Sequence, residues 1–211
     1  MSTQRANIPL PALPLVPILR GLSPAEAEPV GQALFAAGFT MLEVPLNRPG
    51  ALECITILRR TLPTAIVGAG TVLSVEHVEA VALAGGQLIV SPDCNPDVIK
   101  ASVALGLWSL PGVATPSEAF AALRAGAHGL KAFPAESIPP AAVKAWRAVL
   151  PAEVALLPVG GITPERMAVY RDAGANGFGI GGALYSPGLS LEMIEARAHE
   201  FAAAWRALPV A

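Results

Sequence analysis

The chain has 211 residues, a length typical of one domain, and single α/β barrels commonly contain about 200 to 250 residues. Hydrophobic residues make up 53% of the chain and aromatic residues only 5%, so it can bury a large aliphatic core of the kind that parallel sheets prefer. The net charge of −2 and the scattered lysines and arginines exclude the basic surface of a nucleic-acid-binding protein.

Short apolar runs alternate with amphipathic segments along the whole chain. The runs predict strands at Leu15–Leu19, Thr40–Val44, Ala65–Ala69, Leu88–Val90, Leu107–Leu110, Gly129–Ala132, Ala155–Val159 and Gly177–Ile180. The segments between them predict helices near Ala25–Ala37, Ala51–Arg60, Val75–Leu83, Pro96–Ala104, Ser117–Ala125, Pro140–Val149, Pro164–Ala173 and Leu191–Ala207. About eight β–α units at a spacing of roughly 20 to 25 residues are typical of a parallel sheet.

The boundaries of the predicted helices are well marked. Ser23–Glu26 and Thr115–Glu118 have the pattern of capping boxes with proline at the first helical position. Several helices end at a glycine, which suits a left-handed C-cap. No linker or shift in composition divides the chain. Eight units without a boundary favour one (β/α)8 TIM barrel domain over residues 1–211, with a doubly wound sheet as the main alternative.

The apolar character of the chain does not come from a membrane segment. The uncharged run Ala101–Ser117 is broken by glycine and proline and is too short to span a bilayer comfortably. In the proline-rich lead, about residues 1–14, no continuous signal-peptide core forms. Cys54 and Cys94 lie far apart, which indicates neither zinc nor a disulfide framework. We therefore expect a cytoplasmic protein without a membrane partner, and the apolar surplus favours buried subunit contacts.

Lys131 is one of only three lysines and lies in the apolar run Gly129–Pro134. Desolvation disfavours the charged ammonium and lowers its pKa, and a neutral amine can attack a carbonyl to form a Schiff base. An isolated lysine here would more simply reach out to water from a strand end. The residues at neighbouring strand ends favour the reactive role.

In such a barrel the chemistry lies at the C-terminal ends of the strands. Residues of an unexpected kind end or follow the predicted strands at this rim: Arg20, Glu43, Thr71, Pro92 and Lys131. Taken singly, Arg20 could cap a helix, and Glu43 could be a structural salt-bridge partner of Lys131. A buried ion pair recovers little beyond its desolvation cost. The combination therefore favours a site for one small ligand.

Two Gly-Gly pairs follow the last two predicted strands, Gly160-Gly161 and Gly181-Gly182. Tight turns often need glycine, but glycine also lets backbone N–H groups approach an anion, and a helix N-terminus adds favourable partial charge. The loops after strands seven and eight are the usual phosphate-binding place on a TIM barrel. We therefore expect phosphate at these glycines. The three isolated histidines, His77, His128 and His199, stand at no metal-ligand spacing, so we expect no metal.

Together these motifs, in order from about Pro17 to Tyr185, resemble the class I aldolases acting on 2-keto-3-deoxy-6-phospho sugar acids. The resemblance is carried by Ile18–Gly21, Leu42–Asn47, Val67–Leu73, Leu130–Glu136 and Val159–Ile162. It implies a Schiff-base lysine at Lys131 and a general acid/base at Glu43, with no cofactor. It also implies that Arg20 and Thr71 bind the pyruvate-derived end, that Phe133 and Pro92 line the pocket, and that Gly160, Gly161, Gly181 and Gly182 hold the phosphate. A homotrimer is implied as well.

Within that family, two features are similar to the galactonate branch rather than the gluconate branch. Val159 stands before the first Gly-Gly pair in place of threonine, and Pro45–Pro49 follows Glu43 in place of a motif with an Arg-Thr pair. A valine removes a hydroxyl that could bond the sugar, which alters stereochemical preference. Gly182-Ala183 stands where relatives often have a serine, which leaves backbone N–H groups as the expected phosphate contacts.

The resemblance implies reversible cleavage of 2-dehydro-3-deoxy-6-phosphogalactonate to pyruvate and glyceraldehyde 3-phosphate. The epimeric phosphogluconate substrate is the alternative. Two further hypotheses remain open: a phosphate-binding isomerase or synthase on the same barrel, which needs no imine, and a phosphosugar-binding sensor without activity. Detection of a covalent pyruvate adduct separates the aldolase from both.

Overall fold

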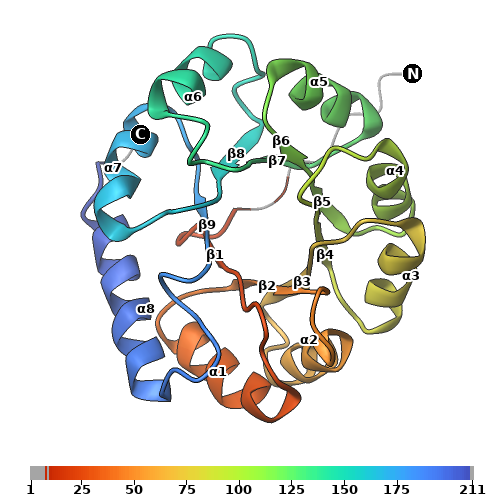
Figure 1. Ribbon diagram of the computed structural model, residues 1–211, viewed down its shortest axis with the longest axis vertical. Helices are drawn as coiled ribbons and strands as arrows, with labels where there is room; N and C mark the ends of the chain where they lie inside the picture. Colours follow the sequence, from red (N-terminus) through yellow and green to blue (C-terminus); the bar gives the residue numbers. More distant parts are fainter. Residues whose placement is uncertain (1–7, 9, 210–211) are drawn as a thin grey trace.

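The computed structural model describes residue 8 and residues 10–209. Residues 1–7, 9 and 210–211 lie outside the described residues, and they include much of the predicted proline-rich lead. Strands form the centre of the molecule, and α-helices surround them in a ring (Figure 1). This is the (β/α)8 barrel that the sequence predicted.

The helices agree closely with the predicted segments. They are α1 Pro24–Ala36, α2 Ala51–Thr61, α3 Val75–Leu83, α4 Pro96–Ala104, α5 Pro116–Ala125, α6 Pro140–Arg147, α7 Pro164–Asp172 and α8 Leu191–Arg206. Five of them have proline in the first turn, where the missing N–H costs nothing. The capping box between Ser23 and Glu26 is present at the start of α1.

The strands are short and buried. They are β1 Leu15–Pro17, β2 Met41–Pro45, β3 Ile66–Gly70, β4 Leu88–Val90, β5 Trp108–Leu110, β6 Gly112–Val113, β7 Gly129–Ala132, β8 Ala155–Pro158 and β9 Phe178–Ile180. β5 and β6 are two parts of one barrel position, because Pro111 lacks an N–H and interrupts the ladder between them. The predicted strand Leu107–Leu110 corresponds to β5 alone.

All of the strand pairs are parallel, and they close into a ring. The ladders join β1 to β9, β2 through β5 in order, and β6 through β8. Bridges complete the ring, from Ile18 to Glu43 between β1 and β2 and from Val159 to Gly179 between β8 and β9. The His128 amide donates to the Ser109 carbonyl at 3.0 Å, which joins β5 to β7. Closure excludes the doubly wound alternative, because an open sheet would have two edge strands.

Candidate functional site

The barrel brings the residues predicted for its rim to the C-terminal ends of its strands. Glu43 lies in β2 and Lys131 in β7, while the others follow the ends of β1, β3 and β4: Arg20, Thr71 and Pro92. Phe133 and the glycine pairs follow β7, β8 and β9 at the same rim. Residues more than 100 positions apart in sequence thus face one end of the barrel, as the rule for this fold requires.

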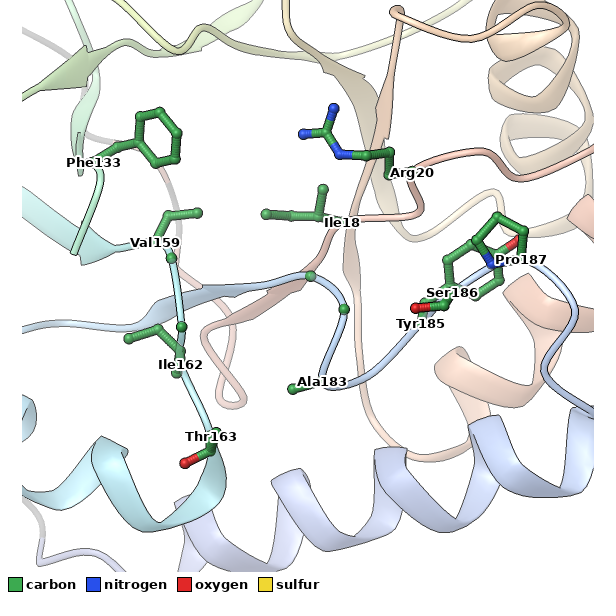
Figure 2. Close-up of a pocket in the computed structure, with 14 residues that line it drawn as sticks. Ile18, Arg20, Phe133, Val159, Ile162, Thr163, Ala183, Tyr185, Ser186 and Pro187 are labelled. Carbon is green, nitrogen blue, oxygen red and sulfur yellow. The ribbon is translucent and has the colours of Figure 1, made fainter. Parts of the chain in front are cut away.

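A cavity of about 450 Å³ opens at this rim (Figure 2). Seven of the predicted site residues line it: Arg20, Phe133, Val159, Gly160, Gly161, Gly181 and Gly182. The Arg20 and Phe133 side chains lie on opposite sides of it, from the ends of β1 and β7 (Figure 2). Four predicted residues do not line the cavity: Glu43, Lys131, Thr71 and Pro92.

Lys131 and Glu43 lie inside the barrel wall. Their exposed fractions are only 7% and 3%, so both side chains are removed from bulk water. Burial lowers the pKa of the Lys131 amine; the carboxylate of Glu43 opposes this shift, and the positive charge of Arg20 adds to it. Burial raises the pKa of the Glu43 carboxyl, opposed by the positive charges of Lys131 and Arg20. Both groups are therefore shifted toward their neutral forms.

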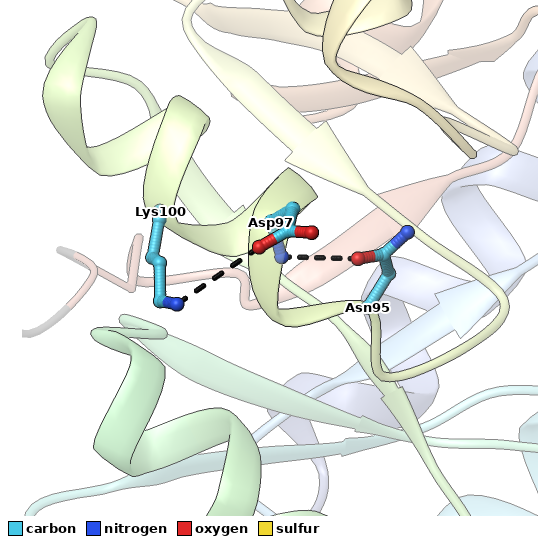
Figure 3. A network of polar contacts seen from close by, with 3 residues as sticks. All are labelled: Asn95, Asp97 and Lys100. Atoms are coloured by element: carbon cyan, nitrogen blue, oxygen red, sulfur yellow. Dashed lines mark hydrogen bonds and ion pairs between the residues drawn. The ribbon is translucent and has the colours of Figure 1, made fainter.

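Lys131 and Glu43 are neighbours without being an ion pair. Among the described residues, the ion pair present is between Lys100 and Asp97, at 3.9 Å on the exposed surface of α4 (Figure 3). The Lys131 Nζ instead lies 4.6 Å from the centroid of the Phe133 ring. Glu43 thus forms no close ion pair with Lys131, although its charge acts on the pKa of that lysine. The lysine amine touches a ring that itself lines the cavity.

The surrounding strands leave room for the Glu43 carboxyl. A Cβ at Gly70 on the neighbouring strand β3 would overlap that carboxyl, so β3 needs glycine where it passes Glu43. The next residue, Thr71, has a φ of 56°, in the left-handed region that costs a non-glycine residue about 1–3 kcal/mol. Such backbone strain is typical of functional sites and is consistent with the predicted role of Thr71 at this rim.

The loop after β8 presents free backbone donors to the cavity. Gly160 and Gly161 have φ values of 118° and 57°, which favour glycine. Within the described part of the chain, the N–H groups of Gly161 and Ile162 have no hydrogen-bond acceptor. The Arg166 guanidinium donates to the Gly161 carbonyl and so holds the loop from its other side. This loop leads directly into α7, whose N-terminus adds positive partial charge.

The loop after β9 forms a single helical turn. The Gly181 carbonyl accepts hydrogen bonds from the amides of Leu184 at 2.9 Å and Tyr185 at 3.1 Å. The N–H groups of Gly182 and Ala183, at the start of this turn, find no acceptor in the described residues. Two loops that line one cavity thus both carry N–H groups without an acceptor, an arrangement that suits an anion with several oxygens.

The cavity also contains residues that sequence reasoning missed: Ile18, Ile162, Thr163, Ala183, Tyr185, Ser186 and Pro187. Ile18 and Ile162 lie at the ends of motifs that carry the family resemblance, but no role was assigned to them. Nothing in the sequence around Ser186 predicts a place in the site. The turn after β9 alone brings this serine to the cavity.

Two properties of the described residues complete the site. They contain no cluster of three or more His, Cys, Asp or Glu side chains placed to hold a metal ion. They also contain no helix that is long and apolar enough to cross a membrane.

Comparison with known proteins is consistent with this geometry. A family model described as KDPG and KHG aldolase matches residues 8–198. A Rhizobium meliloti (strain 1021) protein named "Probable 2-dehydro-3-deoxy-6-phosphogalactonate aldolase" is 45% identical over 205 residues, covering 96% of this chain and 97% of that protein. The 2-dehydro-3-deoxy-6-phosphogalactonate aldolase of Escherichia coli (strain K12) is 45% identical over 195 residues, covering 92% and 95%.

Solved structures lead to the same family. One described as "Native KDPGal structure" has a TM-score of 0.91 and 44% identity, covering 92% of this chain and 95% of that chain. A KDPG aldolase from Legionella pneumophila, "with pyruvate captured at low pH as a covalent carbinolamine intermediate", has a TM-score of 0.79 and 28% identity, covering 90% and 94%. The relation that the sequence motifs predicted is therefore confirmed: the chain belongs to the KDPG and KHG aldolase family.

Proposed function

We propose that this protein is a Schiff-base aldolase that reversibly cleaves 2-dehydro-3-deoxy-6-phosphogalactonate to pyruvate and D-glyceraldehyde 3-phosphate. The observation that carries the proposal is a buried lysine beside a buried glutamate, next to a cavity with free backbone donors. Family membership supports the lyase activity, and relatives at 45% identity named for the galactonate substrate support the choice of sugar acid.

The reaction starts at Lys131. Because burial lowers its pKa, more of the amine is neutral at a given pH than in an exposed lysine, and its lone pair attacks the C2 ketone of the substrate. Glu43, whose pKa burial raises, holds a proton that it gives to the carbinolamine oxygen. Water leaves, and a protonated imine remains on Lys131.

The carbon–carbon bond breaks in the next step. The Glu43 carboxylate takes the proton of the C4 hydroxyl, and the electrons of the C3–C4 bond move into the protonated imine. Glyceraldehyde 3-phosphate departs and leaves an enamine. Reprotonation at C3 and hydrolysis then release pyruvate and restore the Lys131 amine. A positioned acid/base group contributes a factor on the order of 10² to 10⁴ in rate.

The remaining predicted residues bind the two ends of the substrate. Arg20, whose guanidinium stands at the cavity, pairs with the carboxylate, together with Thr71. Phe133 forms an apolar wall beside the reacting carbons, and Pro92, which lies outside the cavity lining, stays a proposed second wall nearer to Lys131 and Glu43. The phosphate lies at the other end, at Gly160, Gly161, Gly181 and Gly182. The free N–H groups of both loops and the N-terminus of α7 support this placement.

Val159 is the residue that we propose favours the galactonate epimer. It lines the cavity, is 8% exposed, and offers no hydroxyl to the sugar. We expect the enzyme to cleave the phosphogalactonate faster than the phosphogluconate, and Val159→Thr to shift that ratio toward the phosphogluconate. Steady-state kcat/KM for both epimers, for both proteins, measures this ratio. A wild-type preference for the phosphogluconate would replace the proposal by its epimeric alternative.

Reductive trapping tests the covalent step. Borohydride in the presence of pyruvate should fix a pyruvyl group on Lys131, located by mass spectrometry of peptides. A protein that turns over a phosphosugar without forming this adduct would instead be an isomerase or synthase on the same barrel.

We also keep two further features as proposals. The exposed apolar side chains, among them Leu83 at 90% exposure, support a homotrimer, which light scattering can measure. The free thiols of Cys54 and Cys94 support a reducing, cytoplasmic location.

A further inference from the structure

Ser186 brings a hydroxyl to the cavity that the proposed reaction leaves without a role. It lines the cavity after the turn that follows β9, and its side chain points into it (Figure 2). Among the described residues its Oγ has no hydrogen-bond partner. A hydroxyl that is not used for capping or folding is available to a ligand.

The glycines beside Ser186 are not needed by the backbone. Neither Gly181 nor Gly182 has a left-handed φ, in contrast to Gly160 and Gly161. A Cβ at Gly181 would meet nothing within 4 Å, and a Cβ at Gly182 would meet only the Ser186 Oγ, at 3.9 Å. The turn therefore keeps an open space on the side where the Ser186 hydroxyl lies.

Three donors without a partner belong to this turn. The N–H groups of Gly182 and Ala183 are without acceptors in the described part of the chain, and the Ser186 hydroxyl stands next to the Cβ position of residue 182. A ligand group that satisfies all three must offer several oxygens in a compact arrangement, which a phosphate does. Among the parts of the proposed substrate, the carboxylate belongs at Arg20, so the phosphate is the group left for this turn.

We propose that the Ser186 hydroxyl donates a hydrogen bond to the substrate phosphate, an inference that rests on the proposed function. Ser186 is thereby a binding residue for the phosphorylated end, and it has no part in imine chemistry at Lys131.

The test compares a phosphorylated with an unphosphorylated ligand. For Ser186→Ala we expect the KM for 2-dehydro-3-deoxy-6-phosphogalactonate to rise about ten-fold, the loss typical of one hydrogen bond to a charged group. The pyruvate concentration for half-maximal borohydride trapping should stay unchanged, because pyruvate has no phosphate. Ser117→Ala, at an exposed serine of α5, is the matched control and should leave both quantities unchanged.

A second variant moves the hydroxyl. Gly182→Ser in the Ser186→Ala background places a hydroxyl in the same open space, and we expect it to restore most of the lost affinity. Recovery would also show that the single variant had folded.

Three outcomes would overturn the inference: an unchanged KM in Ser186→Ala, an equal weakening of pyruvate trapping, or no recovery in the double variant with trapping intact. A wild-type protein that neither cleaves the substrate nor traps pyruvate would instead reject the proposed function itself. The two failures are therefore distinguishable.

Discussion

The wall of the barrel and the loops at its mouth present their functional groups in opposite ways. In the wall, strands β2 and β7, which lie across the ring from each other (Figure 1), hold Glu43 and Lys131 as buried side chains whose pKa values burial moves toward neutrality. At the mouth, the loops after β8 and β9 hold backbone N–H groups around an open cavity, with glycines in place of side chains. The wall changes the reactivity of ionisable groups, and the loops offer fixed donors to an anion.

The difference has a physical reason. A reactive amine needs desolvation, which only the closed wall of the barrel can supply. A phosphate carries its own charge and stays partly hydrated, so exposed donors at a helix N-terminus suit it. Substitutions in the two regions should therefore have different effects: those in the wall should lose chemistry, and those in the loops should lose affinity.

The largest effect is expected for Lys131→Met. It removes the nucleophile, so neither cleavage nor borohydride trapping of pyruvate should remain. It should also stabilise the fold at neutral pH. A lysine whose folded-state pKa is lowered destabilises the protein below its unfolded pKa of about 10.4, because the unfolded chain binds the proton more tightly. A pKa lower by one in the folded than in the unfolded chain corresponds to about 1.4 kcal/mol of stability.

Urea unfolding of Lys131→Met and wild type at several pH values measures this stability difference, which should shrink as the pH rises toward 10.4. Lys144→Met, at an exposed position of α6, is the control and should change neither stability nor trapping. Retained pyruvate trapping in Lys131→Met would remove the basis of the proposed mechanism.

An intermediate effect is expected at the glycine loops. The same substitution, glycine to alanine, should change stability and substrate affinity at Gly161 but substrate affinity alone at Gly181. Gly161 has a φ of 57°, and a Cβ added there would lie only 2.8 Å from the Arg166 Nη1. Alanine at this position should therefore cost about 1–2 kcal/mol of stability and raise the KM for the phosphorylated substrate. At Gly181 there is no left-handed φ and no close neighbour. Alanine there should keep the unfolding free energy and raise the KM alone.

Thermal unfolding and steady-state kinetics of the two alanine variants provide this contrast. If Gly181→Ala proved as unstable as Gly161→Ala, the two loops would not differ in the way that their backbone angles indicate.

The smallest effect is the shift in pH dependence expected for Arg20→Gln, read at saturating pyruvate because the same change removes the proposed contact with the carboxylate. Arg20 lowers the pKa of Lys131 and of Glu43, so its removal should raise both. Imine formation needs the neutral amine, and the acid limb of its pH profile should therefore move to higher pH. Initial rates of borohydride trapping across pH measure this shift, with Arg124→Gln on α5 as control. A profile that stays in place would place Arg20 outside the electrostatic reach of Lys131.

Much of this protein can be predicted from its sequence because the signals are local. Amphipathic segments and proline-capped helix starts predicted the eight helices of the described residues within a few residues, and the lysine in an apolar run predicted the depressed pKa at Lys131. The order of the motifs also predicted the aldolase family, which the comparisons confirm. The roles of individual site residues stay predictions.

Other properties depend on contacts between distant segments, and only the tertiary structure decided them. Closure of the ring needed the bridges at Ile18 and Val159. That Pro111 divides one barrel strand into β5 and β6 is also visible only in the structure. Local sequence could not tell that Lys131 contacts the Phe133 ring instead of pairing with Glu43. Nor could local sequence show that Gly161 is needed for its left-handed φ, whereas Gly181 leaves open space in the turn that carries Ser186. Hydrophobic periodicity and capping act over a few residues, whereas desolvation and cavity shape are set by every strand that surrounds the site.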